Sequence, residues 1–124
     1  MRISFLNTKV FVLLFSLLLL AAPGAFAADP FITPEQGKAM IVEKKDLVIL
    51  DVRNPNEYVV AHYPGSLNIP VKELETRFNE VPSGRPVLIH CAKGKRAERA
   101  YEVLREKRPD IKDVLFIKGE PIFE

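Results

Sequence analysis

The sequence predicts an α/β domain with a mostly parallel central sheet flanked by helices, because short apolar runs alternate with helical patterns. The apolar runs at 47–52 (LVILDV), 87–90 (VLIH) and 114–117 (VLFI) are too continuous for amphipathic helices and predict buried strands. The helical patterns between them favour crossover connections and parallel strands. In such sheets, functional sites gather where strands end and helices begin.

The sequence also carries signals for where the helices start. Thr33 to Gln36 (TPEQ) has threonine as the cap, proline in the first helical position and glutamine returning a hydrogen bond, which predicts a helix to about Lys44. Residues 54–57 (NPNE) have the same order of cap residue, proline and returning side chain, and they predict a short helix through about Val60. Asp29 and Pro30, which precede the first of these helices, are expected to be a loose start.

The second half of the chain continues the alternation of strand and helix patterns. Pro64 and Gly65 suit the centre of a type II turn, in which glycine takes the positive φ at little cost, and a brief strand is expected at 66–69. Apolar residues at helical spacing predict a helix over 71–78, and a second apolar face predicts a helix over about 96–107. The residues that form this second face are Ala97, Ala100, Tyr101 and Leu104.

Residues 1–27 have the layout of a secretory signal peptide. A basic start precedes an apolar run at 10–22, a Pro-Gly break, and Ala25-Phe26-Ala27, which predicts cleavage after Ala27 or Ala28. An uncleaved membrane anchor is the alternative, but the apolar run is shorter than the ~20 residues that span a bilayer. The sequence therefore predicts export, to the periplasm or an equivalent location, and a mature domain over 28–124.

The charge balance excludes some classes of partner. The chain has 18 cationic and 16 acidic residues, and removal of the first 27 residues takes away Arg2 and Lys9, which leaves equal numbers. A neutral chain of mixed charge predicts no nucleic-acid partner and no stable membrane association after cleavage. Any function that depends on charge must therefore be local.

The chain has a single cysteine, Cys91, which lies between the predicted strand at 87–90 and the helix that follows. A lone cysteine is either buried and inert, a partner for another chain, or a reactive thiol. The loop 91–96 (CAKGKR) favours the reactive thiol. Tight strand-to-helix loops turn backbone N–H groups inward, the helix dipole adds positive potential, and three cationic side chains follow the cysteine. These features stabilise a thiolate, which is the nucleophilic form.

Three motifs in this chain resemble those of rhodanese (thiosulfate sulfurtransferase) domains. The loop CAKGKR is similar to the six-residue active-site loop of the family, with cysteine first and glycine fourth. Residues 50–53 (LDVR), followed by Glu57-Tyr58, resemble its LDVR…EY segment, and 62–70 (HYPGSLNIP) resemble its GHIPGAxNIP segment. Order and spacing agree over about 33–119. Among single-domain members, the chain is most similar to the exported phage shock protein E type.

The resemblance implies a rhodanese-like fold and a ping-pong sulfur transfer. Cys91 would take the outer sulfur of thiosulfate or a similar anionic donor, hold it as a persulfide, and pass it to cyanide or a thiol. The substrate-binding residues would be those of the loop, with Lys93 and Arg96 contributing side chains and the amides doing most of the stabilising: Ala92, Lys93, Gly94, Lys95 and Arg96. No cofactor is implied, and two histidines with one cysteine form no recognisable metal set.

The chain departs from the family pattern at two places. Ala61 and Tyr63 replace the usual glycine and isoleucine around His62. The family usually continues through a Gly-Gly pair to a tryptophan and a closing helix, whereas this chain has the shorter segment 119–124 (GEPIFE). The sequence therefore leaves open what forms one wall of the pocket and what covers one face of the sheet.

Other polar residues near the motifs are predicted to have structural roles. His90 precedes Cys91, but neighbouring side chains in a strand point to opposite faces, which argues against a Cys–His dyad. His62 is expected to hold its loop by hydrogen bonds. Asp51 is expected to bind loop amides and Arg53 to pair with Glu57, because sulfur transfer needs no general acid.

Two other functions remain open from the sequence. Dual-specificity phosphatases of similar architecture use a cysteine-to-arginine anion loop with one more residue; the four residues between Cys91 and Arg96 favour sulfur over phosphate, and arsenate reduction is a weaker variant. Alternatively, the domain is a sulfur carrier or a protein-interaction module without turnover. A thiosulfate:cyanide transferase assay separates these functions.

Overall fold

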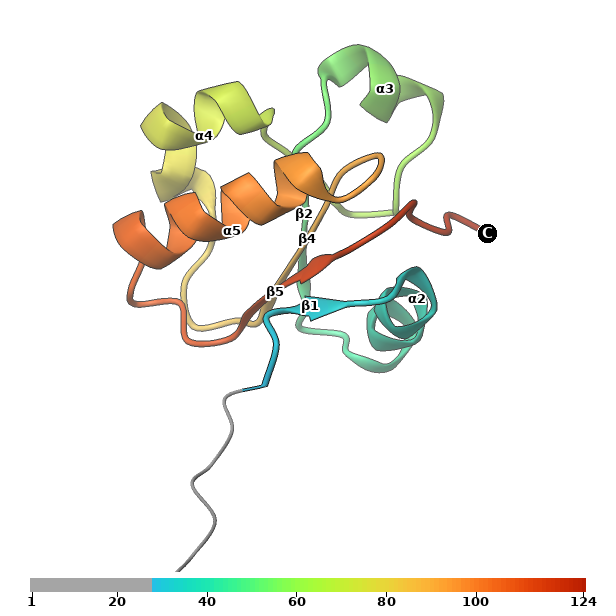
Figure 1. The fold of residues 1–124 in the computed structure, drawn as a ribbon, viewed down its shortest axis with the longest axis horizontal. Coiled ribbons are helices and arrows are strands. Elements are labelled where there is room, and N and C mark those ends of the chain that lie inside the picture. The colour runs from blue at the N-terminus through green and yellow to red at the C-terminus, as the bar shows by residue number, and fades with distance from the viewer. Residues whose placement is uncertain (1–27) are drawn as a thin grey trace, which may run out of the picture.

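The structure is a computed structural model that describes residues 28–124, so the predicted signal peptide and its cleavage site lie outside the described residues. Five parallel strands form one sheet in the order β1-β5-β4-β2-β3. Their bounds are β1 Phe31–Ile32, β2 Val48–Asp51, β3 Leu67–Asn68, β4 Val87–His90 and β5 Val114–Ile117. The α/β class with a parallel sheet is therefore confirmed (Figure 1).

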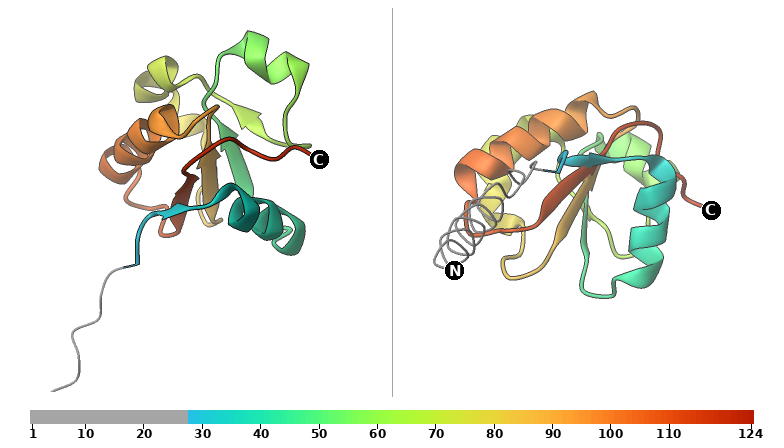
Figure 2. Two further views of the ribbon diagram at one scale, coloured as in Figure 1. Left: turned by 45° about the vertical axis from the view of Figure 1, so that its right-hand side comes forward. Right: turned by 60° about the horizontal axis from the view of Figure 1, so that its bottom comes forward.

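Helices cover both faces of this sheet, as Figure 2 shows. On one side lies α2; on the other lie α4 and α5, while α3 stands above the end of the sheet where β2 and β4 finish (Figure 1). The bounds are α2 Pro34–Glu43, α3 Pro55–Val60, α4 Val71–Arg77 and α5 Lys95–Lys107, with a 3-10 turn at Phe78–Glu80. Within residues 28–124, none of these helices has the length and apolar character needed to cross a bilayer.

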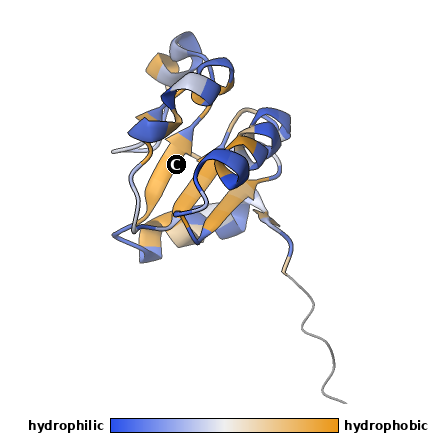
Figure 3. Ribbon diagram, turned by 90° about the vertical axis from the view of Figure 1, so that its left-hand side faces the viewer, coloured by the Kyte–Doolittle hydropathy of each residue, from blue (hydrophilic) through white to orange (hydrophobic). Residues whose placement is uncertain are grey.

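The sheet is apolar along its central strands, which Figure 3 shows as a continuous apolar layer between polar helix surfaces. Every residue of β2 and β4 is buried. This explains why both strands are continuous apolar runs rather than alternating ones, since each face meets a helix. The sheet therefore has one core on each face. Successive side chains of a strand point into opposite cores, so side chains that are neighbours in the chain are kept apart.

The predicted helix starts are confirmed. The Thr33 side chain accepts a hydrogen bond from the Gln36 amide at 3.2 Å, and the Gln36 side chain accepts one from the Thr33 amide at 2.9 Å. At the second predicted start, the Asn54 amide donates a hydrogen bond to the Glu57 carboxylate at 2.9 Å. At the predicted turn, Gly65 has a φ of +74°.

The prediction of a loose start was wrong at Pro30. Its carbonyl accepts a hydrogen bond from the Phe116 amide at 3.0 Å, and the two following residues form β1 beside β5. Two residues carry too little pattern to predict a strand. The pairing depends on β5, which lies at the other end of the chain and is brought to β1 only by the fold.

Candidate functional site

Cys91 lies directly after β4, in the loop that leads into α5. It is 1% exposed and belongs to the core between the sheet and α5. It also lines an open pocket of about 410 Å³, whose other lining residues are Ala92, Lys93, Lys95 and Arg96. The sulfur is therefore at the base of a pocket whose walls come from the loop itself.

Two backbone amides point at this sulfur. The Gly94 amide donates a hydrogen bond to Sγ at 3.0 Å, and the Ala97 amide donates one at 3.3 Å. Of the amides predicted from Ala92 through Arg96, that of Gly94 binds the sulfur, and Ala97 adds one that the sequence did not identify. Ala97 enters because α5 begins at Lys95, which places its first-turn amides toward the sulfur.

Gly94 is required by its backbone conformation and by its surroundings. Its φ is +114°, and a Cβ there would lie 3.2 Å from the Gly119 nitrogen and 3.3 Å from the Lys118 Cα. The loop therefore packs directly against the chain that leaves β5. An L side chain at Gly94 would meet both the strain of a positive φ and a backbone contact.

We expect Gly94→Ala to lower the free energy of unfolding by roughly 1–3 kcal/mol and to slow alkylation of Cys91, because the amide that binds Sγ must move. Urea denaturation and the rate of labelling measure the two effects. Gly84→Ala is the matched control: Gly84 has a φ of +73°, but apart from its own atoms and its two chain neighbours no atom of residues 28–124 lies within 4 Å of the position that a Cβ would take. Equal losses in the two variants would contradict the role of the backbone contact.

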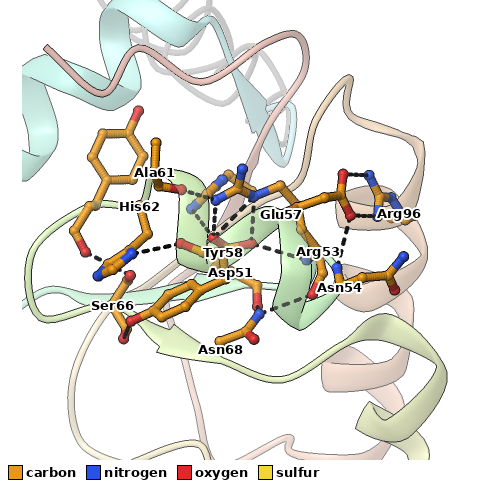
Figure 4. Close-up of polar contacts among 12 residues, drawn as sticks. Asp51, Arg53, Asn54, Glu57, Tyr58, Ala61, His62, Ser66, Asn68 and Arg96 are labelled. Carbon is orange, nitrogen blue, oxygen red and sulfur yellow. Dashed lines mark hydrogen bonds and ion pairs between the residues drawn. The ribbon is translucent and has the colours of Figure 1, made fainter.

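Asp51 and Arg53 form a buried ion pair, which Figure 4 shows. The Arg53 Nη2 donates to Asp51 Oδ2 at 2.7 Å and to the Ala61 carbonyl at 2.6 Å. Asp51 Oδ1 also accepts a hydrogen bond from the Arg53 amide at 3.0 Å, as expected of a carboxylate that binds loop amides. The pair has a structural position, between the end of β2 and the loop after α3.

The prediction that Arg53 pairs with Glu57 was wrong. Glu57 instead accepts two hydrogen bonds from Arg96, at 2.8 and 3.0 Å (Figure 4). Hydrogen bonds from Arg96 and from the Asn54 amide lower the pKa of Glu57 to about 2. Arg53 turns to the carboxylate two residues earlier because both groups lie in the buried interior, where an unpaired charge is costly.

The two histidines take structural positions. The His62 Nδ1 is 2.7 Å from the Tyr58 carbonyl oxygen, and the centroids of the His62 and Tyr58 rings stack at 3.8 Å, so His62 holds its loop as predicted. His90 lies on the face of the sheet opposite Cys91, against Tyr63 and Phe123. This separation of His90 from Cys91 is what the alternation of side chains in β4 predicts.

His90 makes stability depend on pH. Burial lowers its pKa from 6.5 to about 4, and neither ring nitrogen has a hydrogen-bond partner among residues 28–124. The folded pKa is below the unfolded value, so the unfolded chain binds the proton more readily, and stability falls as the pH falls from about 6.5 to about 4. We expect a loss of up to about 3 kcal/mol across this range.

Urea denaturation at pH 7 and at pH 4.5 measures this dependence. His90→Gln should flatten it, whereas His62→Gln, which changes an exposed histidine, should leave it unchanged. Most carboxylates titrate below this range, with unperturbed pKa values of about 3.9 to 4.3. A wild-type stability that is the same at the two pH values would contradict the assignment.

The segment 119–124 covers one face of the sheet. The sequence had left open what covers this face. The centroid of the Phe123 ring is 4.9 Å from that of the Tyr63 ring and 4.9 Å from the Arg53 guanidinium carbon. The Ile122 amide donates a hydrogen bond to the Tyr63 hydroxyl at 3.0 Å. This segment therefore covers the core on the His90 side, and none of its residues lines the pocket at Cys91.

The sequence predicts no metal site, and the structure places the side chains that could ligate a metal. Within residues 28–124, no three side chains of the types that ligate metals come together. Of the five predicted loop residues, four line one pocket with Cys91, and the fifth, Gly94, donates its amide to the sulfur. Whether they bind a substrate stays a prediction.

Comparison with known proteins shows to which family the chain is similar. The family model of the rhodanese-like domain matches residues 33–119. The chain is 31% identical over 67 residues to a thiosulfate sulfurtransferase, GlpE, of Pseudoalteromonas translucida, covering 54% of this chain and 64% of the relative. It is 32% identical over 105 residues to an adenylyltransferase and sulfurtransferase, MOCS3, of Arabidopsis thaliana, covering 71% of this chain and 23% of the relative.

A crystal structure of a rhodanese-like domain protein from Staphylococcus aureus superimposes with a TM-score of 0.64 at 26% identity, covering 74% of this chain and 87% of that one. Among the curated relatives the chain spans less than half of the length of several. The family model nevertheless spans most of the described residues, including the cysteine loop. The chain belongs to the rhodanese-like domain family, which includes sulfurtransferases.

Proposed function

We propose that this protein is a sulfurtransferase that moves sulfane sulfur from thiosulfate, or a similar anionic donor, to a thiophilic acceptor through a persulfide on Cys91. The observation that carries the proposal is the pair of amides, from Gly94 and Ala97, that donate to Sγ at the base of a pocket lined by cationic side chains. Such amides stabilise negative charge on sulfur, both before the reaction and after the second sulfur is added.

The reaction has two steps. The Cys91 thiolate attacks the outer sulfur of thiosulfate; the new S–S bond forms as the bond between the two thiosulfate sulfurs breaks, and sulfite leaves with the electron pair. Cyanide or a thiolate then attacks the outer sulfur of the persulfide. The S–S bond to Cys91 breaks, the thiolate is restored, and thiocyanate or a persulfide of the acceptor leaves.

The loop supplies the substrate-binding groups. Lys93 and Lys95 are exposed and line the pocket, so their ammonium groups can approach an anionic donor. The Arg96 side chain also lines the pocket while it is bound to Glu57. Amides of the loop, from Ala92 through Arg96, would bind the oxygens of the donor, in addition to the two that bind the sulfur.

The proposal includes a location. Residues 1–27 support export by their signal-peptide pattern, and export supports a member of the phage shock protein E type. The donor and acceptor would then be small molecules or thiols outside the cytoplasm. Detection of the mature chain, starting at Ala28 or Asp29, in the exported fraction tests this part by itself.

The carrier and phosphatase alternatives predict different results. A carrier would accept one sulfur atom without catalytic release, and a phosphatase would turn over phosphate esters faster than thiosulfate. The Arg96 guanidinium already makes two hydrogen bonds to Glu57, and this favours a sulfur donor over a phosphate ester as the substrate. An arginine that is already paired with a carboxylate is a weaker clamp for a phosphate group.

Intact-mass measurement tests the proposal. Thiosulfate alone should raise the mass of the reduced protein by one sulfur atom, and cyanide should reverse the change with release of thiocyanate. Steady-state assays with both substrates then distinguish an enzyme from a carrier. Absence of a sulfur adduct on the reduced protein, at a thiosulfate concentration that saturates the assay, would rule the mechanism out.

A further inference from the structure

A carboxylate bound to one of the residues that line the pocket at Cys91 has no part in the proposed reaction. Its cationic lining comes from Lys93, Lys95 and Arg96. Glu57, which comes from α3, binds the last of these with both carboxylate oxygens. The pocket therefore presents less positive charge than its lining residues suggest, since one of the three cations is paired.

The geometry of this pair sets it apart from the ion pairs at the surface. Glu57 and Arg96 are 39 residues apart in the chain and join α3 to the first turn of α5. Their side chains are 31% and 33% exposed, so water screens the pair only in part. Two parallel hydrogen bonds between guanidinium and carboxylate hold the orientation more firmly than one bond.

Glu57 is charged at neutral pH. Its pKa is about 2, because Arg96 donates hydrogen bonds to the carboxylate. The pKa of Arg96 is raised, first by its hydrogen bonds to Glu57 and to a lesser degree by the nearby Cys91 sulfur. Because Arg96 and Cys91 line the same pocket, a change of charge at Glu57 alters the potential at the sulfur.

We propose that Glu57 is a specificity-determining residue of this pocket: by pairing with Arg96 it offsets part of the positive charge at Cys91 and so limits the preference for anionic over neutral reagents. This inference deepens the proposed function and rests on it for the role of Cys91 as the reacting group. A pocket with an unpaired arginine would attract the anionic donor more strongly, but it would also hold the departing sulfite more strongly.

Alkylation of Cys91 measures this preference without sulfur transfer. Iodoacetate is an anion and iodoacetamide is its neutral counterpart, so the ratio of their rate constants, anionic over neutral, reports the potential at the sulfur. In Glu57→Gln, which keeps the shape and loses the charge, the ratio should rise about two- to tenfold. In Arg96→Met, which leaves the carboxylate unpaired, the ratio should fall below that of the wild type. High salt should reduce both changes.

Asp110→Asn is the matched control. Asp110 accepts two hydrogen bonds from Arg108, at 2.9 and 2.7 Å, so the substitution removes the same charge from a similar pair. This pair lies beyond the far end of α5, a helix of 13 residues and hence roughly 20 Å long. The ratio should stay at the wild-type value in this variant.

An unchanged or lower ratio in Glu57→Gln would overturn the inference. An unchanged ratio with both reagents slowed equally would indicate a purely structural role for Glu57. The outcome is independent of the proposed function, because alkylation needs no donor. If thiosulfate fails to load the wild type while the ratio rises in Glu57→Gln, the sulfur-transfer proposal fails and the electrostatic inference stands.

Discussion

Replacing Cys91 by alanine is expected to abolish both the sulfur adduct and the transfer activity, with a loss on the order of 10³-fold or more. The chain has one cysteine, so no other thiol can replace it. Cys91→Ser should be equally inactive, because an oxygen in place of Sγ does not form a persulfide with thiosulfate. The measurements are intact mass after incubation with thiosulfate and the rate of thiocyanate formation from thiosulfate and cyanide.

Both variants should remain folded. Alanine at position 91 removes one buried sulfur atom, and we expect a loss of about 1–2 kcal/mol in the free energy of unfolding. His62→Gln is a suitable activity control, because His62 binds the Tyr58 carbonyl and does not line the pocket. Transferase activity that persists in a folded Cys91→Ala variant would contradict the assignment of the nucleophile.

Breaking the Asp51–Arg53 pair is expected to have the largest effect on stability. Asp51 is fully buried and the Arg53 side chain is 8% exposed, so removal of either partner leaves a charge in the interior. We expect Arg53→Met or Asp51→Asn to lower the free energy of unfolding by about 3–5 kcal/mol. In Arg53→Met the buried carboxylate also remains 3.6 Å from the His90 Nε2, without the guanidinium that compensates it in the wild type.

Urea denaturation at pH 7 measures these losses. Arg77→Met is the matched control, since Arg77 pairs with Glu73 and Glu80 in an exposed position, and its loss should be much smaller than that of either buried variant. The double variant, Asp51→Asn with Arg53→Met, should recover part of the stability, because both charges are then gone. A loss below about 1 kcal/mol in each single variant would show that the buried pair is not needed for stability.

The elements that depend on local patterns could be predicted from the sequence. The cap patterns at Thr33 and Asn54 need only residues three positions apart, and both helices start where predicted. The strands at 87–90 and 114–117 have the predicted bounds, because continuous apolar runs between polar segments carry their own signal. Such features are stabilised by neighbours in the chain or by burial alone.

The sequence by itself determined the α/β class, the strand-to-helix junction at Cys91, and the use of glycine at position 94. Only the tertiary structure decided that Glu57 binds Arg96, that Phe123 covers the His90 face, and that the Ala97 amide reaches the sulfur. Each of these contacts joins groups from separate elements. Their partners are chosen by how the helices pack on the sheet, and that packing is a property of the whole core.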